Sequence, residues 1–233
     1  MWKLPGSLVQ QVITKSVPIS RAARAARRGN HRLLYGTIRP FCGFAGSPVI
    51  DGDLPILTAD APGMARERRT GKLVWSSEKR PKTVAADNPR HTTGVDYSTP
   101  VVYGSEGIRR ALVSGGKGLS SVDAASGEVL WRYEGGPCHD YQVADPVLVD
   151  NAVFESFDRT ARDPIWAYSV LLEIAEAGFT VRLKSPDLYI GITSPVVLDG
   201  FISGCQAGPY YSESSLRGID HETGRLRWEK RCS

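Results

Sequence analysis

The sequence predicts an all-β protein, a β-propeller built from four units of four antiparallel strands. Two repeated elements and a turn-rich composition carry this prediction. The first element is a Pro followed by β-branched residues, at Pro48, Pro100, Pro146 and Pro195, in steps of 52, 46 and 49 residues. Periods of about 40 to 50 residues are typical of propellers and solenoids. The 233 residues include 24 Gly and 15 Pro, which favours many turns over long helices.

The second repeated element places an acid, a Ser or Thr with Gly, and a Trp at one spacing in three units. It reads ERRTGKLVW at 67–75, DAASGEVLW at 123–131 and DHETGRLRW at 220–228. A carboxylate four residues before the Gly can accept backbone N–H bonds in a tight turn, and Gly allows positive φ there. We expect the Trp to lie on the last strand and pack against the adjacent unit. The element comprises the acids Glu67, Asp123 and Asp220, the glycines Gly71, Gly127 and Gly224, and the tryptophans Trp75, Trp131 and Trp228.

The third unit departs from this pattern. Its GFTVRL segment places Arg182 or Leu183 where the Trp would stand. The longest apolar run of the chain, from Ile165 to Ile174, also lies in this unit. It is long enough for a helix, but its β-branched and aromatic content favours an extended strand. Trp166 is expected to belong to the core.

Each unit divides into four short extended segments separated by Gly-rich turns. In the second unit these are TPVV, IRRALVSG, LSSVD and EVLWRY. One such sheet cannot bury both faces alone, so it must stack on its neighbours, and radial stacking produces a propeller. The predicted blades span 46–80, 98–134, 144–184 and 193–231.

The combination of these two elements resembles the pyrroloquinoline quinone (PQQ)-like repeat. That family builds eight-bladed propellers in quinone-dependent alcohol dehydrogenases and in the lipoprotein of the outer-membrane β-barrel assembly machinery. The resemblance implies an extracytoplasmic or periplasmic protein. It covers about Gly46 to Arg231, and it is specific for the fold rather than for a function, because the family uses one scaffold for enzymes and for binding.

The head segment, residues 1–45, does not match the repeat. The first 50 residues hold eight of the 29 Lys and Arg and no acid, which leaves 21 basic and 25 acidic residues in the other 183. A nucleic-acid binder concentrates basic charge on its folded domain, so we expect no nucleic-acid partner. The segment is a basic docking or targeting arm, or a disordered or partly helical extension; it is interrupted too early by Pro5 and Gly6 to resemble a secretory signal.

Other patterns indicate little chemistry. The cysteines Cys42, Cys138, Cys205 and Cys232 are too far apart for zinc-ligand spacing, so they are free thiols or include one long-range disulfide. Neighbouring residues of an extended strand point to opposite sides, so Cys138 and His139 would not face each other as nucleophile and base. The SGGKG segment at 114–118 lacks the spacing of a phosphate loop and is predicted to be a turn. No apolar run is long enough for a membrane-spanning helix.

Candidate ligand-binding residues lie in the loops expected at one end of the propeller axis. Two Asp-Tyr pairs precede inner strands, and a Lys occupies a turn on the same face. The candidates are His91, Asp96, Tyr97, Lys117, His139, Asp140 and Tyr141. They would form a polar rim that grips a ligand or partner, or they are solvated loop residues.

Four visible units leave three arrangements open. The chain is a half-ring with two exposed faces, two chains pair to complete eight blades, or the ring closes at four. We expect a non-enzymatic protein-interaction scaffold or ligand-binding platform without a cofactor, whose partner is another protein or a second chain at the exposed blade faces. The alternative is a fragment or subunit of a quinone-dependent dehydrogenase, which would bind PQQ with calcium.

Overall fold

A computed structural model describes residues 46–58, 63–77, 97–105, 107–115, 118–135, 143–157, 167–175, 178–207 and 214–232. Within these residues every regular element is a β-strand, and the strands form four antiparallel sheets of four. The all-β propeller-type prediction is confirmed. The head segment and Trp166 lie outside the described residues.

The strands of each sheet follow one another in chain order, so each sheet is a simple meander. The first sheet holds β1 (Val49–Asp51), β2 (Leu54–Leu57), β3 (Met64–Arg66) and β4 (Leu73–Ser76). The second holds β5 (Val101–Ser105), β6 (Ile108–Gly115), β7 (Gly118–Asp123) and β8 (Val129–Glu134). The third holds β9 (Val147–Val149), β10 (Ala152–Phe157), β11 (Tyr168–Ala175) and β12 (Gly178–Ser185). The fourth holds β13 (Val196–Leu198), β14 (Phe201–Ala207), β15 (Ser214–Asp220) and β16 (Leu226–Cys232).

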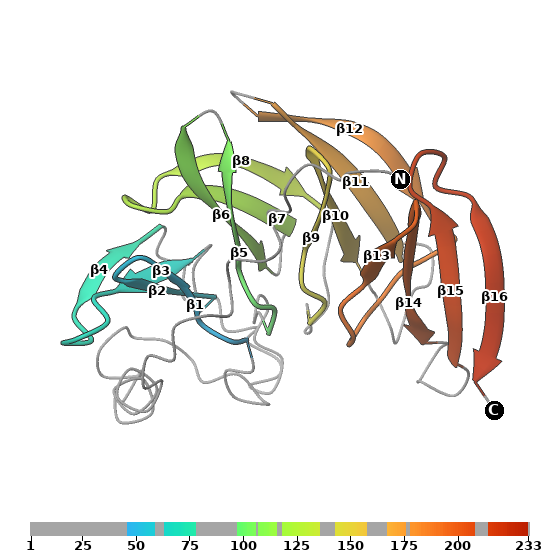
Figure 1. The fold of residues 1–233 in the computed structure, drawn as a ribbon, viewed down its shortest axis with the longest axis horizontal. Helices are drawn as coiled ribbons and strands as arrows, with labels where there is room; N and C mark the ends of the chain where they lie inside the picture. Colours follow the sequence, from blue (N-terminus) through green and yellow to red (C-terminus); the bar gives the residue numbers. More distant parts are fainter. Residues whose placement is uncertain are drawn as a thin grey trace, which may run out of the picture.

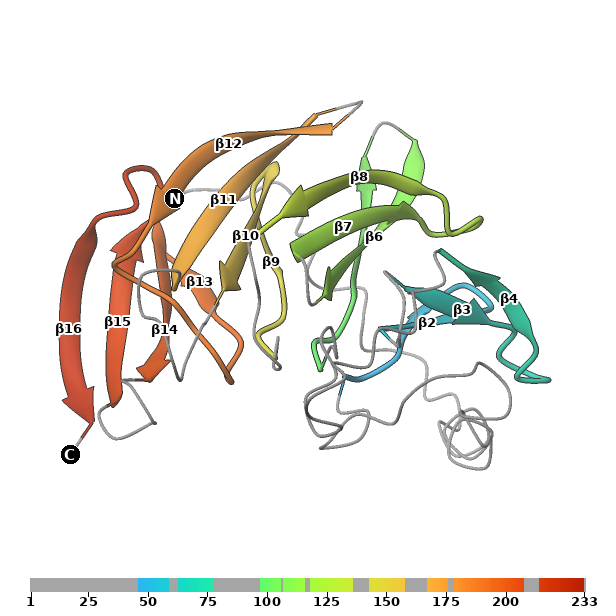
Figure 2. The same cartoon turned by 180° about the vertical axis from the view of Figure 1, so that it is seen from behind.

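The four sheets stand side by side along an arc (Figure 1). The sheet of β1–β4 and the sheet of β13–β16 form its two ends, and they do not meet when the molecule is seen from behind (Figure 2). Closure of the ring at four sheets is therefore excluded. Among the described residues, one face of the first sheet and one face of the fourth have no neighbouring sheet.

The pairing of the last two strands slips by one residue at the same place in every sheet. The pairs at this place are Ala65 with Trp75, Ser121 with Trp131, Leu171 with Leu183 and Gly218 with Trp228. A β-bulge of this kind bends the outer strand and re-aims its side chains. The shared register shows that Leu183, and not Arg182, occupies the tryptophan position of the third sheet.

Apolar side chains fill the space between consecutive sheets. One cluster joins Trp75 of the first sheet to Val122 of the second. Another joins Trp131 to Val153 of the third sheet, and a third cluster joins Leu171 to Ile219 of the fourth. The apolar run of the third unit forms β11, so the strand prediction is confirmed there over Tyr168–Ala175. Gly115 at the end of β6 pairs with Gly118 at the start of β7, so the SGGKG segment joins two paired strands; Gly116 and Lys117 lie outside the described residues.

Candidate functional site

Three turns of one design join the third and fourth strands of the first, second and fourth sheets. In each, the Gly N–H donates to the backbone carbonyl of the acid at 2.8 Å. The φ angles are 74° at Gly71, 78° at Gly127 and 69° at Gly224, a region that side chains with a Cβ rarely adopt. This explains why Gly stands four residues after the acid.

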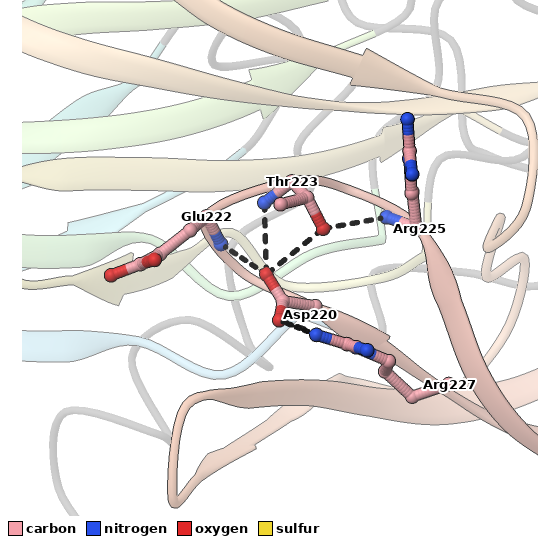
Figure 3. Close-up of polar contacts among 5 residues, drawn as sticks. All are labelled: Asp220, Glu222, Thr223, Arg225 and Arg227. Atoms are coloured by element: carbon pink, nitrogen blue, oxygen red, sulfur yellow. Dashed lines mark hydrogen bonds and ion pairs between the residues drawn. The ribbon is translucent and has the colours of Figure 1, made fainter.

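The acid of each turn accepts hydrogen bonds from the turn itself. Asp220 Oδ1 accepts from the backbone N–H of Glu222 at 3.0 Å and of Thr223 at 2.9 Å, and from the Thr223 hydroxyl at 3.0 Å (Figure 3). Its other oxygen accepts from Arg227 Nη2 at 2.9 Å. Asp123 accepts from Ala125 and Ser126 in the same manner.

These hydrogen bonds favour the ionised carboxylate. The backbone N–H of Thr223, followed by the Arg227 guanidinium, holds the pKa of Asp220 well below its usual range. Burial acts to raise the pKa of Asp123, but the hydrogen bonds from Ser126 outweigh it and the pKa is lowered overall. The Thr70 hydroxyl lowers the pKa of Glu67. Carboxylates held ionised in this way stabilise a turn and are poor proton donors near neutral pH.

The first tryptophan joins the first sheet to the turn of the second. Trp75 is only 7% exposed, and its Nε1 donates to the Ala124 carbonyl at 3.0 Å. Its ring lies so close to Gly127 that a Cβ there would come within 2.4 Å of Trp75 Cε3. The turn glycine is thus required twice, by its φ and by the ring above it.

The junctions between the second and third sheets and between the third and fourth sheets each replace one partner of the tryptophan–glycine contact. The ring centroid of Trp131, also 7% exposed, lies 5.1 Å from that of Phe179, because β11 and β12 extend past the usual turn as a longer hairpin. Leu183 lies over Gly224, where a Cβ would meet Leu183 Cδ1 at 3.1 Å. The sequence predicted that Arg182 or Leu183 takes the tryptophan position of the third unit. It did not predict the longer hairpin of β11 and β12 that brings Phe179 to Trp131.

A chain of hydrogen bonds links the residues that precede the four marker prolines. Asp145 Oδ1 accepts from the Thr99 N–H at 2.5 Å, and Asp145 Oδ2 accepts from the Ser194 hydroxyl at 2.8 Å. The Ser47 N–H donates to Thr99 Oγ1 at 3.2 Å. We call Ser47, Thr99, Asp145 and Ser194 the pre-proline belt. It ties the first strands of all four sheets together. It was not predicted from the sequence, although a hydroxyl or carboxylate residue before every marker Pro was the signal.

Tyr97 is the one predicted loop residue that falls in the described part of the chain. It is buried, at 5% exposure. The other candidates, His91, Asp96, Lys117, His139, Asp140 and Tyr141, lie outside the described residues, and their gathering on one face stays a prediction. Cys138 lies outside them as well.

The loop between the third and fourth sheets is described in full. Leu188 and Ile190 are buried in the core, and the Ile190 N–H donates to Ser156 Oγ at 2.5 Å. The Tyr189 N–H donates to Gln206 Oε1 at 3.2 Å. Ile192 then turns outward and is exposed. This loop therefore presents one apolar side chain on a backbone held from both neighbouring sheets.

The fourth sheet exposes the face that its three predecessors bury. We call the side of a sheet that carries the tryptophan position its forward face, and the opposite side its back face. On the forward face of the fourth sheet Val196 is 62% exposed, Leu198 65% and Trp228 39%. The prediction that Trp228 packs against an adjacent sheet differs from the structure, since its ring lies on Gly218 of its own sheet.

The first sheet is open on its other side. Ile50 is 47% exposed and Leu73 45%, and both lie on its back face. Ile50 adjoins Val49, which is aligned through β2 and β3 with Trp75, so Ile50 points to the other side. Leu73 points there too, because the β-bulge pairs it with Arg66, the strand neighbour of Ala65. The molecule thus exposes two apolar sheet faces, the forward face of the fourth sheet and the back face of the first sheet. Exposed apolar patches of this sort are typical of interaction surfaces.

Metal-binding side chains do not cluster in the described part of the chain. No three His, Cys, Asp or Glu side chains there are placed to share a metal ion. Cys205 of β14 has a free, exposed thiol, whereas Cys42 lies outside the described residues. No helix in the described part of the chain has the length and apolar character needed to cross a membrane.

The family model described as outer membrane protein assembly factor BamB matches residues 64–233. The chain belongs to this family. Outer membrane protein assembly factor BamB of Yersinia pestis is 26% identical over 156 residues, which cover 67% of this chain and 34% of that protein. The chain therefore spans about a third of the length of this BamB relative.

Solved structures similar to this BamB-family chain include two designed proteins and one natural one. The computationally designed Ika8 protein has a TM-score of 0.42 at 8% identity, over 79% of this chain and 61% of that one. The designed Ika4 protein has 0.41 at 8%, over 80% and 90%. Apo AztD from Citrobacter koseri has 0.41 at 12%, over 81% and 47%.

Proposed function

We propose that this chain is a non-enzymatic propeller-type scaffold that binds protein partners in outer membrane protein assembly. The match of the BamB family model to residues 64–233 carries this proposal. A scaffold needs a rigid frame and exposed apolar contacts, and the chain offers both. Its sheets are joined by buried clusters, while Ile192 and the two open sheet faces are exposed to solvent.

The proposal assigns the turn-plus-tryptophan element to keeping the scaffold rigid, as a docking motif between sheets. Trp75 combines a buried ring, an indole hydrogen bond and a glycine seat on the next sheet. Burying an aromatic side chain stabilises a junction by several kcal/mol, roughly 25 cal/mol for each Å² of apolar surface. Loops carried by sheets fixed in this way would keep their spacing when a partner binds.

The proposed partner surface is the end of the molecule where the loops between sheets gather. Ile192 is its described apolar contact, and the six polar candidates outside the described residues would surround it. Aromatic or aliphatic side chains within a polar rim are typical of protein interfaces. The proposal includes a periplasmic location, by family, and no bound cofactor.

Site-specific photo-crosslinking in the native host tests the partner surface. A photoreactive residue replaces Ile192, and the matched control replaces Val181, an equally exposed aliphatic residue on β12. We expect Ile192 to give adducts with a protein of outer membrane assembly, identified by mass spectrometry, and Val181 to give none. Absence of adducts at Ile192, or equal adducts at both positions, contradicts the proposal.

A cofactor titration tests the non-enzymatic part. The purified chain is incubated with PQQ and Ca²⁺, desalted, and assayed for quinone absorbance and for dye reduction with primary alcohols. We expect neither signal above that of a protein without this fold. Quinone that stays bound together with alcohol-dependent dye reduction would establish a dehydrogenase instead.

A further inference from the structure

We propose that the forward face of the fourth sheet is covered in solution by the back face of the first sheet of a second copy of this chain. The contact is reciprocal, so two copies close one ring. This inference goes beyond the scaffold role, since it concerns the ends of the arc and not the loop surface. It rests on the equivalence between the two open faces and the junctions already formed inside the chain.

The open forward face repeats a face that is buried elsewhere in the molecule. Counted from the marker proline, Val196 and Leu198 correspond to Val101 and Tyr103 of the second sheet. Val101 and Tyr103 pack with Trp131 in the cluster that the third sheet covers. The fourth sheet keeps apolar residues at all three positions although nothing among the described residues covers them. The equivalent tryptophans are Trp75, Trp131 and Trp228.

The open back face repeats the surface that receives such a forward face. By the same count Ile50 corresponds to Val102, and by strand register Leu73 corresponds to Val129. In the second sheet, Val102 and Val129 pack against the cluster that contains Trp75 of the first sheet. The back face of the first sheet therefore carries the apolar residues that receive a forward face. Among the described residues, only the fourth sheet has an uncovered forward face to match it.

The polar parts of a junction are present as well. Trp75 uses the Ala124 carbonyl and the Gly127 seat, which belong to the turn of the second sheet. The first sheet has the same turn, in which Arg68 follows the acid and Gly71 has a φ of 74°. The indole of Trp228 in one copy would thus find a glycine seat and a carbonyl acceptor on the first sheet of the other.

The arrangement of the ends permits reciprocal pairing. The first and fourth sheets stand at opposite ends of an arc that is open on one side (Figures 1 and 2). A head-to-tail contact gives a closed ring if the rotation closes and a filament if it does not. When two arcs face each other, both forward faces and both back faces are covered. A filament always leaves one forward face and one back face exposed, at its two ends.

Light scattering of the full chain after gel filtration tests the proposal. At about 100 μM, where micromolar affinities are detected, we expect twice the mass of one chain. Trp228→Lys and Leu73→Lys are each expected to give a single-chain mass, because each introduces a charge into one half of the junction. Ile108→Lys, an exposed aliphatic residue on the inner second sheet, is the matched control and is expected to keep the doubled mass.

Mixing the two variants guards against a misfolded variant. The back face of Trp228→Lys and the forward face of Leu73→Lys are both intact, so an equimolar mixture can form one junction. We expect the mixture to recover a two-chain mass that neither variant shows alone. A mixture that stays monomeric while the wild-type chain is a dimer contradicts head-to-tail pairing.

Three other results would overturn the proposal. A monomeric wild-type chain whose Trp228 resists oxidation by hydroxyl radicals shows that a segment of the same chain covers the face. A monomeric chain with a reactive Trp228 shows that the face stays open, and a mass that rises without limit with concentration shows a filament. None of these results affects the crosslinks at Ile192, so failure here is distinguishable from failure of the scaffold role.

Discussion

The second and fourth sheets carry the same apolar pattern and meet different surroundings. Each has a valine directly after its marker proline and a tryptophan at the bulge of its last strand. Trp131 is 7% exposed because the third sheet covers it, whereas Trp228 is 39% exposed. The burial of a repeat tryptophan is therefore a property of the neighbouring sheet, and the repeat by itself specifies only a surface ready to be covered.

Removing a covered tryptophan should have the largest effect. Trp75→Ala deletes a buried ring and its hydrogen bond to Ala124, so we expect the free energy of unfolding to fall by about 3 to 5 kcal/mol. Trp228→Ala, at concentrations where the chain is a monomer, should cost less than about 1 kcal/mol. Urea unfolding followed by circular dichroism measures both. Equal losses would contradict the difference between covered and open faces.

Adding a methyl group at a turn glycine compares a glycine that lies under a tryptophan ring with one that lies under a leucine. Gly127→Ala places a Cβ 2.4 Å from the Trp75 ring and at positive φ, so we expect a loss of about 2 to 4 kcal/mol. Gly224→Ala has the same backbone cost, but it faces a leucine Cδ1 at 3.1 Å that can move, so about 1 to 2 kcal/mol is expected. Thermal unfolding of the two variants should preserve this order, and the reverse order would show that the ring is not seated on Gly127.

The pre-proline belt gives a prediction of intermediate size. Asp145→Ala removes the acceptor shared by Thr99 and Ser194, and we expect a loss of about 1 to 3 kcal/mol. Asp145→Asn should recover more than half of it, because its carbonyl can accept from Thr99 while its NH₂ donates to the Ser194 hydroxyl. Urea midpoints compare the two variants. If Asn is as damaging as Ala, the belt does not act through these hydrogen bonds.

The acidic turns predict the smallest effect, a dependence on pH. The pKa of Asp220 is lower in the folded protein than in the unfolded chain, so its contribution is present above the unfolded value and is lost as the pH falls further. We expect the urea midpoint to decline below about pH 4. Asp220→Asn should start lower at pH 7 and decline less steeply, while parallel curves for both proteins would contradict this role.

The sequence was sufficient for the fold because the elements that define it are local. The spacing from Asp123 to Gly127 to Trp131 sets one turn and one strand, and the structure shows that turn in its hydrogen bonds. The belt was not predicted, because Asp145 and Thr99 lie 46 residues apart and meet only when sheets stack. Phe179 was missed for a similar reason, since the length of its hairpin depends on strand pairing.

The open faces were foreseen only as one of three arrangements. Nothing in the local pattern around Trp228 distinguishes it from Trp75, because both follow a Thr-Gly turn at the same spacing. What differs is the next sheet, which is a property of the assembled arc. Of the predicted loop residues, Tyr97 is buried in the structure, and the sequence around it gave no sign of this.

Hydroxyl-radical footprinting of the tryptophans tests the central claim most directly. The folded chain is exposed briefly at a concentration where it is a monomer, and the oxidation of Trp75, Trp131 and Trp228 is quantified by mass spectrometry. The arc predicts rapid oxidation of Trp228 and strong protection of Trp75 and Trp131. Equal oxidation of all three, or protection of Trp228 together with reactivity of Trp75, would contradict it.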